Sequence, residues 1–141
     1  MFKKRIKYVD YDGNEREEDF YFSLNKAEIT RMNYSREGGV EASLQRMVDK
    51  NDYASIVDFI NDLIASSYGE KSLDGKRFVK SKELTDAFFQ TPAYDELFTE
   101  MINSPKFVQE FAIGVLPAQL QTELLKEGAL DNISQFPEVA P

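Results

Sequence analysis

The chain has 141 residues, of which 42% are hydrophobic, and its 25 acidic residues outnumber its 17 basic residues to give a net charge of −8. This size and apolar content suit one domain with one hydrophobic core, and the acidic balance disfavours nucleic acid as a partner. Because the sequence contains neither Cys nor His, it excludes a disulfide framework, a thiolate nucleophile, and the commonest general base and transition-metal ligand.

Residues 2–24 are predicted to form a β-hairpin around a turn signal, Asp-Gly-Asn at residues 12–14. A two-residue loop would place Arg5 opposite Phe20, whereas a three-residue loop would place Ile6 opposite Phe20. The two registers turn opposite faces of the strands toward the core, because a slip of one residue moves every side chain to the other face. The burial pattern favours the three-residue loop, with Gly or Asn in the left-handed conformation.

Residues 25–127 are predicted to be helical, in a bundle of about five or six helices. Most of these helices have a local start signal, which is a capping side chain and in two cases also a proline at the first helical position. The signals lie at Asn25 with Glu28, at Asp52, at Ser81, at Thr91 with Pro92, and at Ser104 with Pro105. Residues 69–77 are predicted to be a polar loop, and a short amphipathic piece after Pro117 is predicted to end at Gly128.

These elements predict the α+β class, mostly α, in one domain that comprises residues 1–127, followed by a flexible C-terminal tail at residues 128–141. A two-stranded hairpin is marginal by itself, so residues 2–24 must pack on the helices or join the sheet of a neighbouring molecule, which makes self-association a second expectation. No apolar run approaches the length of a transmembrane helix, and no apolar signal segment follows the basic N-terminus. We therefore expect the protein in the cytosol.

A basic cluster is the first candidate for contact with a partner. Interleaved cations and aromatic rings, here Tyr68 and Phe78, can bind single-stranded nucleic acid. However, Glu70, Asp74 and Glu83 dilute the charge of this cluster, which favours a solvated loop that binds a protein. The cluster comprises Lys71, Lys76, Arg77, Lys80 and Lys82.

Aromatic residues at helical spacing are the second candidate. Phe88 and Phe89 are adjacent, and adjacent residues of a helix cannot share one narrow face, so one ring is predicted to be exposed for a partner. The competing interpretation is that Phe88, Leu97 and Phe98 simply belong to the core.

Two stretches of the sequence carry a resemblance to a known family. Residues 11–22 read Tyr-Asp-Gly-Asn-Glu-Arg-Glu-Glu-Asp-Phe-Tyr-Phe, and residues 67–81 read Ser-Tyr-Gly-Glu-Lys-Ser-Leu-Asp-Gly-Lys-Arg-Phe-Val-Lys-Ser. The second stretch continues through Glu83, Phe88, Thr91, Ala93, Tyr94, Leu97 and Phe98. Over roughly residues 1–120 the chain resembles the tail assembly chaperones of long-tailed, siphovirus-type phages, particularly those that infect Gram-positive bacteria.

The resemblance implies a small helical chaperone that coats the tape-measure protein before the tail tube polymerises. It also implies a longer, frameshifted product that recruits the tail-tube protein, residence in the host cytoplasm, and absence from the mature virion. No catalytic residue, metal, cofactor, nucleic acid or membrane is part of this expectation. The predicted contact residues lie where the likeness is strongest and are Tyr68, Lys76, Arg77, Phe78, Phe88, Phe89, Tyr94 and Phe98.

Three other functions stay open at this point. An acidic inhibitor that mimics DNA would need its negative charge ordered on one face, whereas here Lys and Arg are interspersed with the acids nearly throughout. A structural head–tail connector or tail component would be found in mature virions. An enzyme would need clustered buried carboxylates, but in the densest acidic run, residues 17–19, strand neighbours point to opposite faces.

Overall fold

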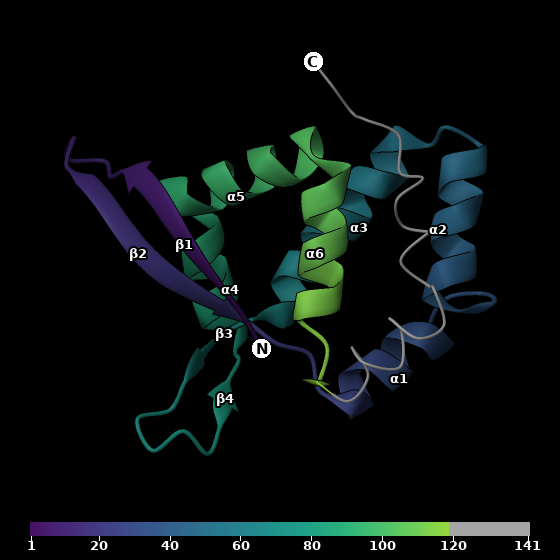
Figure 1. Ribbon diagram of the computed structural model, residues 1–141, viewed down its shortest axis with the longest axis horizontal. Coiled ribbons are helices and arrows are strands. Elements are labelled where there is room, and N and C mark those ends of the chain that lie inside the picture. Colours follow the sequence, from purple (N-terminus) through teal and green to yellow (C-terminus); the bar gives the residue numbers. More distant parts are fainter. Residues whose placement is uncertain (119–141) are drawn as a thin grey trace.

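The computed structural model describes residues 1–118, which form six helices and one four-stranded sheet (Figure 1). In chain order the elements are β1 (Phe2–Val9), β2 (Glu15–Phe22), α1 (Lys26–Tyr34), α2 (Gly39–Asp49), α3 (Tyr53–Ser67), β3 (Tyr68–Lys71), β4 (Phe78–Val79), α4 (Lys82–Phe89), α5 (Pro92–Asn103) and α6 (Pro105–Gly114). The predicted α+β class, mostly α, with an N-terminal hairpin before the helices, is confirmed. The amphipathic piece predicted after Pro117 and the tail predicted at residues 128–141 lie outside the described residues.

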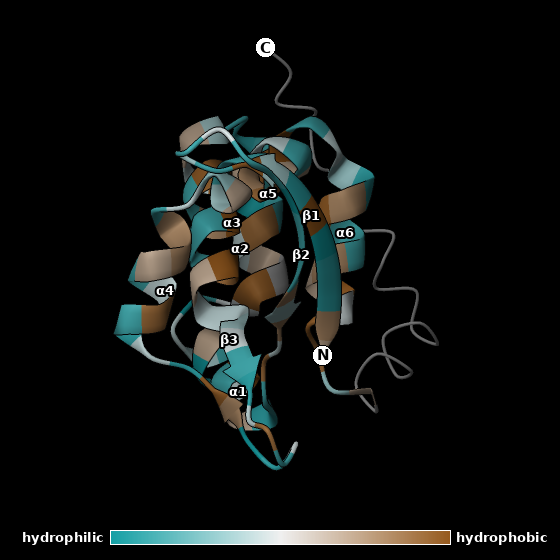
Figure 2. Ribbon diagram, turned by 90° about the vertical axis from the view of Figure 1, so that its left-hand side faces the viewer, coloured by the Kyte–Doolittle hydropathy of each residue, from teal (hydrophilic) through white to brown (hydrophobic). Residues whose placement is uncertain are grey.

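The hairpin of β1 and β2 forms one side of the molecule. Figure 1 shows α1 and α2 at the opposite side, with α3, α5 and α6 between them. Figure 2 shows hydrophobic segments on α2, α3 and α5 behind the largely hydrophilic ribbon of β1. The hairpin therefore packs on the helices. This is one of the two arrangements that the sequence analysis predicts for a hairpin that is only marginally stable by itself.

The register of the hairpin differs from the predicted one. Phe20 lies opposite Lys4, and Ile6 lies opposite Glu18, so the pairing is shifted by two residues. The cause is a longer turn, in which the Asp10 carboxylate accepts hydrogen bonds of 2.9 Å from the backbone N–H groups of residues 12 and 14. Gly13 takes the left-handed conformation, with φ of 83°. Because the shift is even, each side chain keeps its predicted face, and Ile6 is buried.

The sheet is larger than the sequence predicts. Its strand order is β1-β2-β3-β4, and all neighbouring strands are antiparallel. Strand β3 pairs with β2 at Phe22 opposite Tyr68 and Tyr21 opposite Gly69. The prediction of a polar loop over residues 69–77 was therefore wrong for β3, because its pairing partner lies more than forty residues away in the chain and no local pattern reports it.

An aromatic cluster centred on Phe22 joins four elements in the core. The Phe22 ring lies 5.7 Å from the ring of Tyr68 on β3, 5.9 Å from that of Phe88 on α4, and 5.0 Å from that of Phe111 on α6, measured between centroids. Helix α3 supplies the largest group of buried side chains next to this cluster. They are the aliphatic residues Ile56, Ile60, Leu63 and Ile64 and the aromatic residue Phe59. Burial of this surface is the main driving force for the packing of the helices on the sheet.

The predicted helix starts are confirmed. Asn25 and Glu28 form a reciprocal capping box at α1, and a side-chain oxygen accepts a backbone hydrogen bond at the start of four further helices. These capping residues are Asp52, Ser81, Thr91 and Ser104, and proline follows the last two at the start of the helix.

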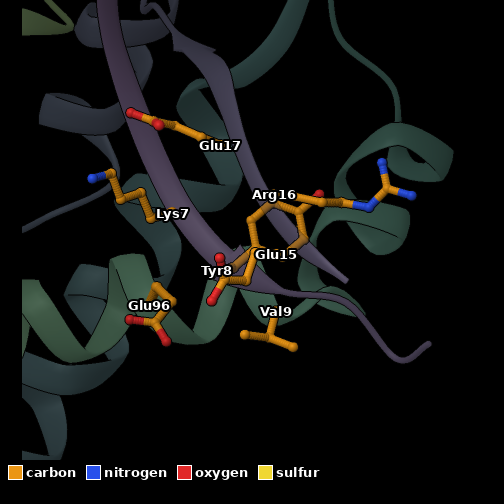
Figure 3. A pocket seen from close by; sticks show the side chains of 7 residues that line it. All are labelled: Lys7, Tyr8, Val9, Glu15, Arg16, Glu17 and Glu96. Carbon is orange, nitrogen blue, oxygen red and sulfur yellow. The ribbon is translucent and has the colours of Figure 1, made fainter. Parts of the chain in front are cut away.

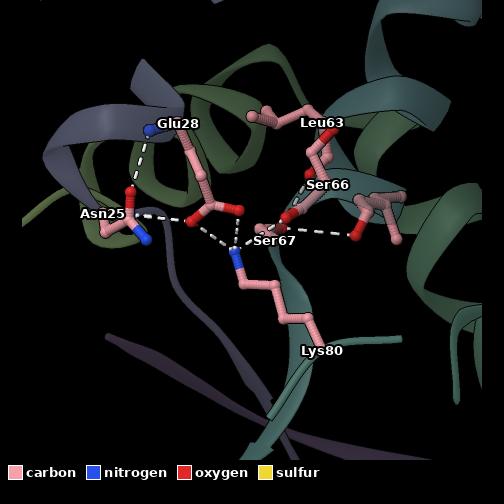
Figure 4. A network of polar contacts seen from close by, with 7 residues as sticks. Asn25, Glu28, Leu63, Ser66, Ser67 and Lys80 are labelled. Carbon is pink, nitrogen blue, oxygen red and sulfur yellow. Dashed lines mark hydrogen bonds and ion pairs between the residues drawn. The ribbon is translucent and has the colours of Figure 1, made fainter. Parts of the chain in front are cut away.

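A half-buried ion pair attaches α1 to the rest of the molecule (Figure 4). No residue of α1 is fully buried, but the Lys80 Nζ lies 2.8 Å from both carboxylate oxygens of Glu28. The same ammonium donates a hydrogen bond of 2.9 Å to the carbonyl oxygen of Ser66, in the last turn of α3. Lys80 thus connects α1, α3 and the segment after β4 through one charged group.

Candidate partner-binding surface

The structure divides the predicted contact residues into two surface groups and a buried pair. The buried pair is Tyr68 and Phe88, which are only 8% and 3% exposed and whose rings stack 4.3 Å apart at an angle of 10°. Burial raises the pKa of the Tyr68 hydroxyl above its ordinary value. These two residues belong to the core, and for Phe88 this is what the competing interpretation of the sequence predicts. The Phe88 ring also contacts the rings of Phe89 and Tyr94.

The first surface group lies on the β3–β4 finger, which we define as residues 68–79. Figure 1 shows this finger extending away from the helices. At its tip the Ser72 N–H donates to the carbonyl oxygen of Arg77 over 2.9 Å. The Asp74 carboxylate accepts hydrogen bonds from the Ser72 hydroxyl and the Lys76 backbone N–H, at 2.6 and 3.0 Å, and the first of these contributes most to a lowered pKa of that carboxyl group. The tip is therefore an ordered turn.

The base of the finger is fixed by close packing. At Gly69 a Cβ atom would lie 2.6 Å from Cε2 of Phe78 and 2.6 Å from the carbonyl oxygen of Val79, so only glycine fits there. The Lys71 ammonium lies 5.7 Å from the centroid of the Tyr21 ring on β2, within the range of a cation–π contact. Phe78 itself is half-buried. These contacts hold the two strands of the finger together and attach β3 to β2.

The tip presents cations around one apolar side chain. Lys71, Lys76 and Arg77 are all exposed, and none of them forms an ion pair within residues 1–118. Between them Leu73 has a relative exposure of 109%. The sequence argument found Lys76 and Arg77 but missed Leu73, since a lone leucine in a polar loop has no periodic pattern that would distinguish it.

The second surface group is an aromatic strip formed by Phe89, Tyr94 and Phe98. The rings of Phe89 and Tyr94 stack 4.2 Å apart at 19°, and the ring of Phe98 follows at 5.9 Å from that of Tyr94. All three rings are half-buried and pack against the core. The Tyr94 hydroxyl donates a hydrogen bond to Asn61 on α3, and burial raises the pKa of that hydroxyl. Phe88 and Phe89 thus differ in burial, but neither ring is exposed as predicted: Phe88 is buried, and Phe89 is half-buried because it stacks on Tyr94.

The two surface groups lie on different parts of the molecule. Figure 1 places the finger tip and α5, which carries Tyr94 and Phe98, at different ends of the fold. The contact residues predicted together from the sequence therefore form two separate surfaces.

The β1–β2 hairpin carries charges of both signs. Arg5 pairs with Glu17 at 2.9 Å and with Asp19 at 3.2 Å, and Arg16 pairs with Asp10 at 2.5 Å. Hydrogen bonding to Arg16 is the largest cause of a lowered pKa at Asp10. Cations thus alternate with acids along this hairpin, which is the opposite of the ordered acidic face that DNA mimicry would need.

An open depression near the end of the hairpin has the same mixed character (Figure 3). Its lining residues come from β1, β2 and α5 and are Lys7, Tyr8, Val9, Glu15, Arg16, Glu17 and Glu96. In the part of the chain that the structure describes, no three acidic side chains are grouped so as to hold a metal ion. Likewise, none of the helices in residues 1–118 is both long enough and apolar enough to cross a bilayer.

Comparison with known protein families gave one full-length result. A family model described as phage tail assembly chaperone matches residues 1–140. Comparisons with curated proteins and with solved structures gave no match. The matched range includes the hairpin, the finger and the aromatic strip.

Proposed function

The chain belongs to the phage tail assembly chaperone family, and on this basis we propose that it binds the tape-measure protein and keeps that protein soluble before the tail tube polymerises. The match over residues 1–140 is the observation that carries the proposal. A tape-measure protein is long and helical, and it aggregates when its apolar faces are free. The net charge of −8 supports this role, because like charge keeps a complex of chaperone and client dispersed.

We place the client contacts on the two surface groups. The aromatic strip offers flat, half-buried rings from Phe89, Tyr94 and Phe98, which suit the apolar face of an amphipathic helix. The exposed cations Lys76 and Arg77 on the finger suit acidic side chains of the same client.

We also propose the location, the host and the further partners of the protein from its family membership. The protein acts without catalysis, in the cytoplasm of a bacterial host, on behalf of a siphovirus-type phage of Gram-positive bacteria. It is absent from the mature virion, and a longer frameshifted form recruits the tail-tube protein. Self-association along the client completes the proposal.

Co-expression with the tape-measure protein of the same phage tests the proposed function. The tape-measure protein should be insoluble when produced alone, and it should become soluble and co-purify with the chaperone when both are produced. If it stays insoluble and no complex forms, the chaperone role is wrong. Detection of the protein in purified virions would then favour the connector role.

A double substitution tests the contact surface. Lys76→Glu with Arg77→Glu should weaken client binding and leave the melting temperature almost unchanged, because both side chains are exposed and unpaired within residues 1–118. The matched control is Lys3→Glu with Lys7→Glu, which makes the same charge change at two exposed residues of β1. Equal weakening by both double variants would indicate a general effect of net charge and would argue against a contact at the finger.

A further inference from the structure

We propose that Leu73 is an anchor residue that inserts into an apolar groove between helices of the tape-measure protein, where carboxylates on the rim of the groove pair with the cations of the finger. This inference rests on the proposed function and names the residue and the chemistry of the contact.

The local structure of the tip gives Leu73 no role within the fold. The turn is closed by Ser72 and Asp74, whose side chains make its hydrogen bonds, and by Gly75, which takes a φ of 73°. Leu73 contributes no hydrogen bond and is fully exposed. Its apolar side chain is therefore accessible to a partner.

The tip is also organised before binding. The Arg77 backbone N–H donates to the Ser72 hydroxyl over 3.0 Å, in addition to the bonds that Asp74 accepts. Close packing of Gly69 against Phe78 holds the base of the finger. A contact residue on such a rigid support loses little conformational entropy on binding, so more of its burial free energy appears as affinity.

Charge decides what kind of groove fits the tip. Lys71, Lys76 and Arg77 flank Leu73 in the sequence and have no ion-pair partner within the described part of the chain, although the Lys71 ammonium also lies over the Tyr21 ring. Complementary charge therefore means a groove with acidic residues at its rim. A second copy of this chain is the competing occupant, although several acids of its hairpin already pair with its own cations, as Glu17 does with Arg5.

Substitution of the anchor tests the inference on the full chain. Leu73→Ser should weaken binding to a solubilised helical fragment of the tape-measure protein roughly tenfold or more, because the complex then lacks one buried leucine side chain. The conservative variant Leu73→Met should bind within roughly threefold of the wild type, because it keeps the apolar volume. Tyr34→Ser, which removes a different exposed hydrophobic side chain, 87% exposed and located on α1, serves as the matched control and should bind like the wild type. The measurement is titration of each purified variant against a solubilised helical fragment of the tape-measure protein, with melting temperatures recorded in parallel.

The outcomes separate the two proposals. Wild-type binding that survives unchanged in Leu73→Ser overturns the anchor and leaves the chaperone function standing. Failure of the wild type to bind the tape-measure protein overturns both. If sedimentation shows that the wild type self-associates and Leu73→Ser does not, the occupant of the anchor is a second copy of this chain, and the inference is wrong in its partner.

Discussion

Lys80 shows how one side chain can connect segments that are distant in sequence. Its ammonium bonds to both oxygens of Glu28 and to the carbonyl oxygen of Ser66. Glu28 also accepts the N–H of Asn25 in the capping box. Because Lys80 and Glu28 are only 22% and 27% exposed, water screens their attraction less than it screens a surface pair.

Loss of this ion pair should reduce the stability of the protein. We expect Lys80→Met to lower the free energy of unfolding by about 2 kcal/mol, since it leaves a half-buried carboxylate and a helix-end carbonyl without their donor. Lys82→Met is the matched control, because Lys82 also forms an ion pair, with Asp86, but is 88% exposed, and it should cost less than about 0.5 kcal/mol. Urea unfolding measures both, and similar losses in the two variants would contradict the assignment.

At the residue scale, local signals were predictable and exposure was not. The caps at Asn25, Ser81 and Thr91 follow from side chains that accept hydrogen bonds from backbone N–H groups three residues away. Tyr68 was predicted as a contact residue, yet it is buried against Phe88, and Leu73 was missed. The neighbour that buries Tyr68 comes from a distant part of the chain, whereas Leu73 is a single apolar residue in a polar loop, where no periodic pattern distinguishes it.

At the scale of elements, the β3–β4 finger depends on one glycine. Strand β3 joins β2 through only two residue pairs, so the packing of Gly69 against Phe78 at the base of the finger matters for its order. The same argument explains why the sequence predicted a loop here: glycine is a poor strand former, and its use in this strand becomes clear only when the Phe78 ring fills the space above it.

A methyl group at this glycine should disorder the finger. We expect Gly69→Ala to lower the free energy of unfolding by about 2 kcal/mol through overpacking and to speed amide hydrogen exchange in β3 and β4. Gly75→Ala is the control, because a Cβ there meets no atom within 4 Å and only the φ of 73° opposes it, at a cost of about 1 kcal/mol. Slow exchange in β3 of Gly69→Ala would show that the finger does not depend on this contact.

In the β1–β2 hairpin, the sequence predicted the buried faces of the strands but not the register of their pairing. The alternation of apolar residues predicted which faces of β1 and β2 are buried, and Ile6 and Phe22 confirm it. The pairing itself was wrong by two residues, because the turn is closed by the carboxylate of Asp10, and alternation cannot distinguish registers that differ by an even number.

At the scale of the whole molecule, three separate carboxylates make folding depend on pH. Bonds from Arg16 to Asp10, from Ser55 to Asp52 and from Ser72 to Asp74 are the largest causes of pKa values below the ordinary 3.8. A pKa that is lower in the folded than in the unfolded state stabilises the fold above the unfolded value, and this stabilisation is lost as the pH falls through the folded value.

Stability should therefore fall as the pH drops below about 4. The triple variant Asp10→Asn, Asp52→Asn, Asp74→Asn should show a flatter dependence between pH 2 and pH 4, because Asn does not titrate. Urea midpoints measured at intervals over this range, for the wild type and the triple variant, check the expectation. Parallel curves for the two proteins would contradict it.

Under the proposed function, the build of the finger tip bears on how long a contact with the client lasts. One leucine and a few surface cations form a small contact, and small contacts dissociate quickly. If many copies hold one long client, the client is covered through their number, with each copy exchanging independently. The dwell time of a single chaperone, rather than the strength of the whole coat, would then set the pace at which the client is uncovered.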